Sequence, residues 1–157
     1  MVSIAKSIKE DIKKGYDLWF AFNNIYDRWA KAHGLTVSML FVFYMIHENE
    51  GICTQQFISE RLLLPKQTIN SILQTIQKYG YIQMALDEND KRNKLISLTP
   101  YGKEYTKKLL GELYSFEERA FISMGDQQRA NLLEGAETLV KNQLLIYEKD
   151  EKKREVK

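Results

Sequence analysis

The chain has little of what catalytic and metal-binding proteins use. It contains one cysteine, Cys53, and two histidines, His33 and His47. One thiol excludes an internal disulfide and does not make a metal cluster. The sequence also lacks a glycine-rich phosphate loop, a nucleophile motif and metal-ligand spacing. We therefore expect no enzymatic activity, no cofactor and no metal site, and we interpret Cys53, which lies in the apolar connector GIC, as an inert buried thiol rather than a redox sensor.

Long apolar runs are missing as well. No run approaches the roughly 20 residues that cross a bilayer, and the amino terminus has no apolar signal-peptide core. We therefore expect a cytoplasmic protein with no membrane partner. A length of 157 residues with 44% hydrophobic content predicts one domain with a core of its own.

Positive and negative side chains nearly balance over the whole chain, which has a net charge of only +2. The distribution is uneven, because residues 61–108 carry nine basic and four acidic side chains while both flanks are slightly acidic. A basic middle between neutral ends is typical of a nucleic-acid-binding surface, although scattered surface lysines produce the same excess.

Glycines and N-cap residues divide the chain into six predicted helices and one hairpin. Gly34, Gly51, Gly80 and Gly125 follow helical apolar patterns, and Thr36, Thr54, Thr99 and Asp126 stand where N-caps belong. The predicted helices cover 5–32, 36–49, 54–62 and 65–80, with two more after Pro100 and after Asp126. Residues 81–86 and 94–98 alternate as strands around the polar tip 87–93. The order is that of a winged helix-turn-helix.

The helix that begins at Pro65 is the predicted recognition helix. Its inward face is apolar, and its outward face carries Lys66, Gln67, Asn70, Ser71, Gln74 and Lys78. Amide and hydroxyl side chains hydrogen-bond base edges in the major groove, and lysines contact phosphates. An ordinary amphipathic helix shows such a polar face too.

The tip of the hairpin is charged. It carries Asn89, Asp90, Lys91 and Arg92, with Lys94 at the start of the next strand. An extended arginine at such a tip enters a minor groove, whose negative potential attracts it, and Asp90 would hold the Arg92 guanidinium in one direction. The alternative is a solvated turn without a partner.

The stretch DKRNKLISLTPYGKE resembles the wing of the multiple-antibiotic-resistance regulator (MarR) family. The family pattern falls on Asp90, Arg92, Ile96, Leu98, Thr99 and Gly102. The segment LLLPKQTINSILQTIQKYGYI resembles the recognition helix of that family, and the element order agrees along essentially the whole chain. Many members carry an arginine in mid recognition helix where this sequence has Ser71, so groove reading is expected to use Lys66, Gln67, Thr68 and Asn70.

The resemblance implies a mainly α fold with a small β-wing. The winged helix-turn-helix would occupy residues 36–99, helical dimerisation regions 1–34 and 100–148, and a charged, disordered tail 149–157. It also implies a homodimer that binds a pseudo-palindromic double-stranded DNA operator as a ligand-responsive repressor. Apolar stripes on both terminal helices favour pairing independently, since a winged helix needs only half of this chain, although they could cover the chain's own core.

Members of the family often respond to small aromatic or phenolic effectors. The residues that would line such a site here are Tyr16, Trp19, Phe20, Phe43 and His47, although aromatics at helical spacing are more often plain core. The alternative function is a winged-helix protein-interaction or assembly module without sequence-specific DNA binding.

Overall fold

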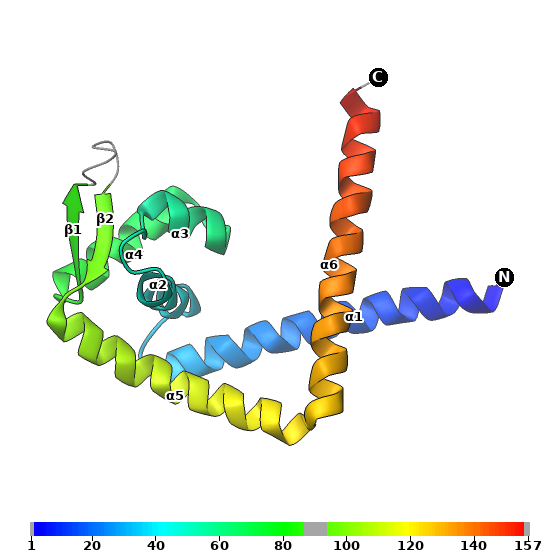
Figure 1. Ribbon diagram of the computed structural model, residues 1–157, viewed down its shortest axis with the longest axis horizontal. Coiled ribbons are helices and arrows are strands. Elements are labelled where there is room, and N and C mark those ends of the chain that lie inside the picture. The colour runs from blue at the N-terminus through cyan, green and yellow to red at the C-terminus, as the bar shows by residue number, and fades with distance from the viewer. Residues whose placement is uncertain (1, 87–93, 156–157) are drawn as a thin grey trace. The chain divides into compact units, whose positions relative to one another are not determined.

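The computed structural model describes residues 2–86 and 94–155 (Figure 1). Six helices and two strands follow in the predicted order within these ranges: α1 Val2–Ala32, α2 Val37–Glu48, α3 Gln55–Leu62, α4 Lys66–Lys78, β1 Ile82–Leu86, β2 Lys94–Leu98, α5 Pro100–Met124 and α6 Asp126–Glu155. The chain forms two compact units, Met1–Lys108 and Leu109–Lys157, and the division between them falls inside α5.

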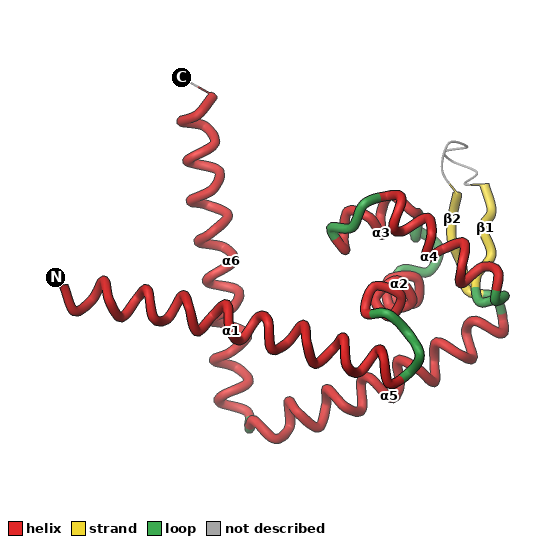
Figure 2. Tube along the Cα trace, turned by 180° about the vertical axis from the view of Figure 1, so that it is seen from behind, coloured by secondary structure: helices red, strands yellow, loops and turns green. Residues whose placement is uncertain are grey.

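Helix α2 is the centre of the first unit. Its sequence VSMLFVFYMIHE is apolar on nearly every side, so it is stable only where other elements surround it. Helices α1, α3 and α4 and strand β2 all pack against it (Figure 2). Its side chains at Leu40, Val42, Phe43, Met45 and Ile46 are buried, which confirms the prediction that this helix forms the core.

Two threonines begin the helices as predicted. The hydroxyl of Thr36 accepts a hydrogen bond from the Met39 N–H at 3.2 Å, and that of Thr54 accepts one from the Phe57 N–H at 3.1 Å. These bonds satisfy backbone donors that the first turn of a helix leaves without partners. Asp126 differs, because it is the first residue of α6 and pairs with Arg129 at 2.6 Å.

Strands β1 and β2 form an antiparallel hairpin whose register runs from Ile82 opposite Leu98 to Leu86 opposite Lys94. Ile82, Ile96 and Leu98 are buried. The Ile96 N–H also donates to the Cys53 carbonyl oxygen at 2.8 Å, so the GIC connector pairs with the outer side of β2.

A threonine clasp joins the base of the hairpin to α5. The Thr99 hydroxyl donates to the Gly80 carbonyl oxygen at 2.6 Å and accepts from the Gly102 N–H at 3.0 Å, while the Thr99 N–H donates to the Tyr81 carbonyl oxygen at 3.0 Å. Gly102 is buried against the same Tyr81 carbonyl, where a Cβ would collide with the oxygen. The LTPYG stretch therefore needs both its threonine and its glycine.

The turn between α3 and α4 contains an unusual leucine. Leu63 has φ 53° and ψ 36°, a left-handed conformation that costs a leucine roughly 1 to 2 kcal/mol. Its side chain is 88% exposed, so packing offsets none of this cost. The backbone is held by Ser59, whose hydroxyl donates to the Leu64 carbonyl oxygen at 2.6 Å and whose carbonyl oxygen accepts from the Leu64 N–H at 3.2 Å.

The second unit consists of the end of α5 and of α6. We expected residues 149–157 to be disordered, but α6 continues to Glu155. Side-chain pairs of helical spacing support this last part, with the Tyr147 hydroxyl donating to Glu151 at 2.7 Å and Lys153 lying 3.4 Å from Asp150. Glutamate, lysine and arginine are also good helix formers, so a charged composition does not by itself end a helix.

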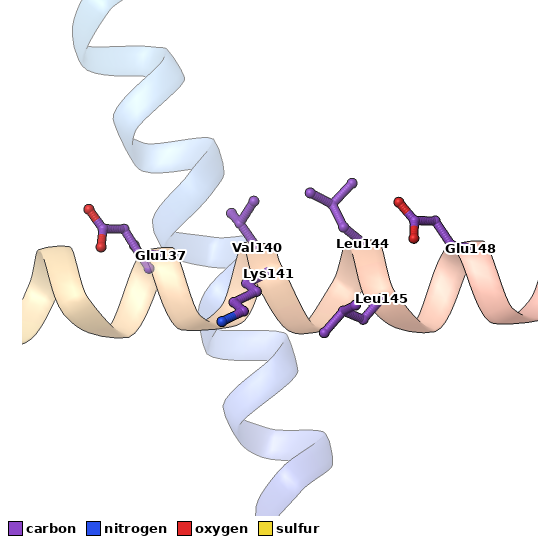
Figure 3. A pocket seen from close by; sticks show the side chains of 7 residues that line it. Glu137, Val140, Lys141, Leu144, Leu145 and Glu148 are labelled. Carbon is purple, nitrogen blue, oxygen red and sulfur yellow. The ribbon is translucent and has the colours of Figure 1, made fainter.

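Helices α1 and α6 each carry exposed apolar side chains. Exposed apolar residues include Ile8, Ile12, Trp19 and Phe22 on α1 and Leu133, Leu139, Val140, Leu144 and Tyr147 on α6. Along α6, a shallow groove is lined by Val140, Leu144 and Leu145 between charged residues (Figure 3). Among the described residues no single helix is apolar and long enough to cross a membrane, although the bent pair Ser7–Ala32 and Val37–Glu48 would satisfy length and composition together.

Replacing Gly102 with alanine should lower the free energy of unfolding by about 1 to 3 kcal/mol, because the added methyl group displaces the Tyr81 carbonyl. Gly111, in the same helix with open space around it, is the matched control, and Gly111→Ala should raise that energy by up to about 1 kcal/mol. Urea denaturation followed by circular dichroism measures both. Equal effects of the two substitutions would contradict the clasp.

Leu63→Gly should raise the melting temperature, because glycine adopts the left-handed conformation without the steric cost. The expected gain is up to about 1 kcal/mol, after subtracting the extra freedom of glycine in the unfolded chain. Leu62→Gly, one residue earlier at the end of α3, is the control and should destabilise the fold. A lower melting temperature for Leu63→Gly would show that the exposed side chain contributes to stability.

Candidate nucleic-acid interface

Helix α4 is held by one face only. Ile69, Leu73 and Ile76 are buried, and the helix packs on α2, α3 and β1. Successive residues of an α-helix are about 100° apart, so these three side chains define one side and leave the opposite side free of the core. The core therefore fixes the orientation of the polar face.

The residues predicted to contact DNA from this helix lie outside the core. Lys66, Gln67, Thr68, Asn70, Ser71, Gln74 and Lys78 are all exposed. By helical rotation, Gln67, Ser71, Gln74 and Lys78 form a line opposite the buried residues, with Asn70 beside it. The structure thus brings Gln67, Asn70, Ser71, Gln74 and Lys78 together on one surface, which we call the α4 face, while Lys66 and Thr68 are exposed in the first turn beside it.

Two hydroxyl groups of α4 are turned back to their own helix. The Ser71 hydroxyl donates to the Gln67 carbonyl oxygen at 3.0 Å, and the Thr75 hydroxyl donates to the Ser71 carbonyl oxygen at 2.9 Å. Each hydroxyl has a single proton, so both donors are used within the helix. The Ser71 hydroxyl keeps only acceptor capacity toward a partner.

The first turn of α4 is open at its amino end. Pro65 precedes the helix with φ −55°, and no side chain caps α4. Gln55 of α3 fixes this turn from the side, because its side-chain NH₂ donates to the Lys66 carbonyl oxygen at 2.9 Å. A helix start carries partial positive charge and outward N–H groups, which favour phosphate oxygens. Sequence reasoning missed Gln55, since its partner lies on another helix.

The hairpin lies next to α4, because β1 packs on it. Lys94 is exposed at the start of β2, at the end of the hairpin farthest from α5. The other tip residues that we predicted to contact DNA, Asn89, Asp90, Lys91 and Arg92, lie outside the described residues. Their role stays a prediction.

The predicted effector residues are dispersed in the first unit. Tyr16, Trp19 and Phe20 are exposed on α1, whereas Phe43 is fully buried in α2. His47 lines a cavity of about 330 Å³ together with Ile46, Glu50, Leu98, Lys103 and Lys107, and Glu50 forms an ion pair with Lys103 across it. Of the five residues, His47 alone lines this cavity.

A group of tyrosines surrounds the threonine clasp, and sequence reasoning missed it. The ring of Tyr81 stacks on that of Tyr101 with 5.1 Å between centroids and lies 4.4 Å from that of Tyr105, with Phe43 beneath. Burial and a hydrogen bond with Tyr101 raise the pKa of Tyr81 to about 12. The pairs Tyr79–Tyr81 and Tyr101–Tyr105 come together only through the hairpin, so no local pattern marks them.

Comparison with known proteins agrees with this geometry. The sequence model of the MarR family matches residues 33–93, which run from the end of α1 to the wing. The structure of NMB1585, a MarR family regulator from Neisseria meningitidis, superposes with a TM-score of 0.73 at 26% identity and covers 89% of this chain and 98% of that one. The winged-helix region of this chain is therefore similar to that of MarR family regulators. The resemblance in the sequence and the predicted fold class are thereby confirmed.

Two further proteins extend the comparison. The transcriptional regulator SarZ of Staphylococcus epidermidis is 32% identical over 98 residues, which are 62% of this chain and 58% of SarZ. This chain therefore spans little more than half the length of that relative. The MepR–DNA complex of S. aureus shares the MarR fold at 16% identity, with a TM-score of 0.66, and covers 82% of this chain and 96% of that one.

Cys53 should not respond to mild oxidants. It is fully buried, and burial raises the pKa of its thiol to about 12, so almost no reactive thiolate forms near neutral pH. Labelling of the folded protein with a thiol reagent should be slow below pH 10 and fast after denaturation in urea. Rapid labelling of the native protein, or loss of a functional property under peroxide in wild type but not in Cys53→Ser, would contradict this.

Proposed function

We propose that this protein is a sequence-specific double-stranded DNA-binding transcription regulator. The α4 face carries the proposal, because a core-anchored helix presents exposed amides and lysines with an open amino terminus. An α-helix fits the major groove of B-DNA, and such side chains contact base edges and phosphates there. MepR, whose fold this chain shares, is a DNA-binding example of the same architecture.

We further propose that it acts as a homodimer on a pseudo-palindromic operator. The exposed apolar side chains of α1 and α6 support pairing, because surfaces of this kind are costly in water. Within α6, the groove around Val140 and Leu144 gives a second copy apolar contacts flanked by charged residues (Figure 3). In such a dimer the two α4 helices should be separated by about 34 to 36 Å, one turn of B-DNA.

We also propose that the protein is a repressor and that a small aromatic or phenolic effector relieves the repression. The cavity beside His47 supports it, because its walls come from α2, from the base of β2 and from the first turns of α5. A ligand there would contact the core of the winged helix and the start of α5 at once, so its binding would be sensitive to how these elements pack.

Selection of duplexes from a random pool tests the DNA-binding proposal. Wild type should enrich an inverted repeat, and its affinity should fall steeply with salt because neutralised phosphates release counterions. Lys66→Ala and Lys78→Ala should each reduce the slope of log K against log salt by about 1. The matched control is Lys149→Ala, an exposed lysine of α6 far along the chain, which should leave the slope unchanged.

A folded protein that enriches no duplex at low salt would contradict the proposal. The surface of α4 would then serve protein contacts, and the interaction-module alternative would take its place. Circular dichroism of each variant, which should match wild type, separates lost binding from lost folding.

A further inference from the structure

We infer that the α4 face reads adenines, so the operator half-site is rich in A·T pairs at the bases that α4 contacts. This inference rests on the proposed function and makes it more specific. It assigns the readout to three amide side chains, Gln67, Asn70 and Gln74, all of which are exposed on α4.

The chemistry of the face selects adenine over guanine. Adenine presents an N7 acceptor and an N6 donor in the major groove, and an amide matches this pair with one donor and one acceptor. Guanine presents two acceptors, N7 and O6, which an arginine or lysine satisfies with two donors. Helix α4 contains no arginine, and its only cations, Lys66 and Lys78, are its first and last residues.

The hydroxyl groups of Ser71 and Thr75 do not act as donors to the bases. Ser71 stands between Gln67 and Gln74 on the outward line, yet its proton is engaged by the Gln67 carbonyl oxygen at 3.0 Å. Thr75 is engaged in the same way by Ser71 at 2.9 Å. A short side chain at the centre of the line also leaves room for the longer amides on both sides.

Helical rise sets the spacing of the bases that are read. Gln67 and Asn70 are three residues apart, or about 4.5 Å along the axis, close to one base step of about 3.4 Å. Gln67 and Gln74 are seven residues apart, or about 10.5 Å, close to three base steps. When α4 lies along the groove, the amides therefore address two neighbouring base pairs and a third about two steps further on.

The two lysines have a different part in this arrangement. Lys66 lies at the open amino end of α4 and Lys78 in its last turn, so both flank the amides. A lysine ammonium is a compact and strongly hydrated charge, which suits contact with phosphate rather than selection of a base. They fix the position of the helix, and the amides supply the sequence preference.

Selection from a duplex pool with a randomised core of 20 base pairs tests the inference. Wild type should enrich adenines at the spacing given above. Gln67→Ala and Gln74→Ala should each relax the preference at one position of the half-site by roughly 5- to 150-fold, the discrimination of one good bidentate contact. Thr75→Ala is the matched control: Thr75 is exposed on the same helix and lies outside the predicted contacts, and the substitution should leave the preference unchanged because its hydroxyl proton bonds within the helix.

A base analogue tests directly whether an amide side chain contacts the N7 atom of adenine. In the enriched duplex, 7-deazaadenine at a contacted position removes the N7 acceptor and nothing else from the major-groove edge. It should weaken wild-type binding and have no further effect on the variant that lacks the matching amide, as a double-mutant cycle requires.

Three results would overturn the inference. Guanines enriched at the contacted positions would do so, as would a Thr75→Ala effect equal to that of Gln67→Ala. Salt-dependent binding with no base preference would overturn it while leaving the DNA-binding proposal in place. Failure to bind any duplex at low salt would overturn the proposed function, and the readout with it.

Discussion

Thr99 joins three parts of the first unit. Its hydroxyl donates to the Gly80 carbonyl oxygen, just after α4, and accepts from the Gly102 N–H in α5. Its backbone N–H donates to the Tyr81 carbonyl oxygen at the base of the hairpin. Because Gly102 has no Cβ, α5 approaches the backbone of Tyr81 closely enough for these bonds to form together. The relative placement of α4, the hairpin and the start of α5 depends on this contact.

The two sides of α4 contribute differently to stability. Its buried isoleucine and leucine side chains hold it on α2, while no side chain of the α4 face is needed for the core. A polar residue on this face can therefore change with little effect on folding, which is a usual property of surface positions. The same separation explains why Ser71 can occupy mid-helix, where many MarR members carry an arginine, without disturbing the fold.

The sequence predicted correctly the helices and strands that are determined by residues close to one another in the chain. Threonine caps, glycines after helices and the period of apolar residues act over a few positions, and they located α2, α3, α4 and the hairpin within two residues. Contacts between distant segments were missed, among them the tyrosine group and the bond from Gln55 to Lys66. The sequence also could not predict the hydrogen bond of the Ser71 hydroxyl, because a polar side chain on a helix bonds either to an outside partner or to its own backbone. The helical end of α6 was not predicted, because its charged composition indicated disorder although glutamate, lysine and arginine are good helix formers.

The burial of Cys53 has a practical consequence for studying this protein in solution. The chain has one cysteine, and its side chain is fully buried with a thiol that stays protonated near neutral pH. A cysteine introduced at an exposed position, such as Lys94 beside the wing tip or Lys141 on α6, would then be the one site that a maleimide dye or spin label modifies in the native state. In the proposed homodimer, distance measurements between such labels would need no cysteine-free background and would report the spacing of the two hairpins directly.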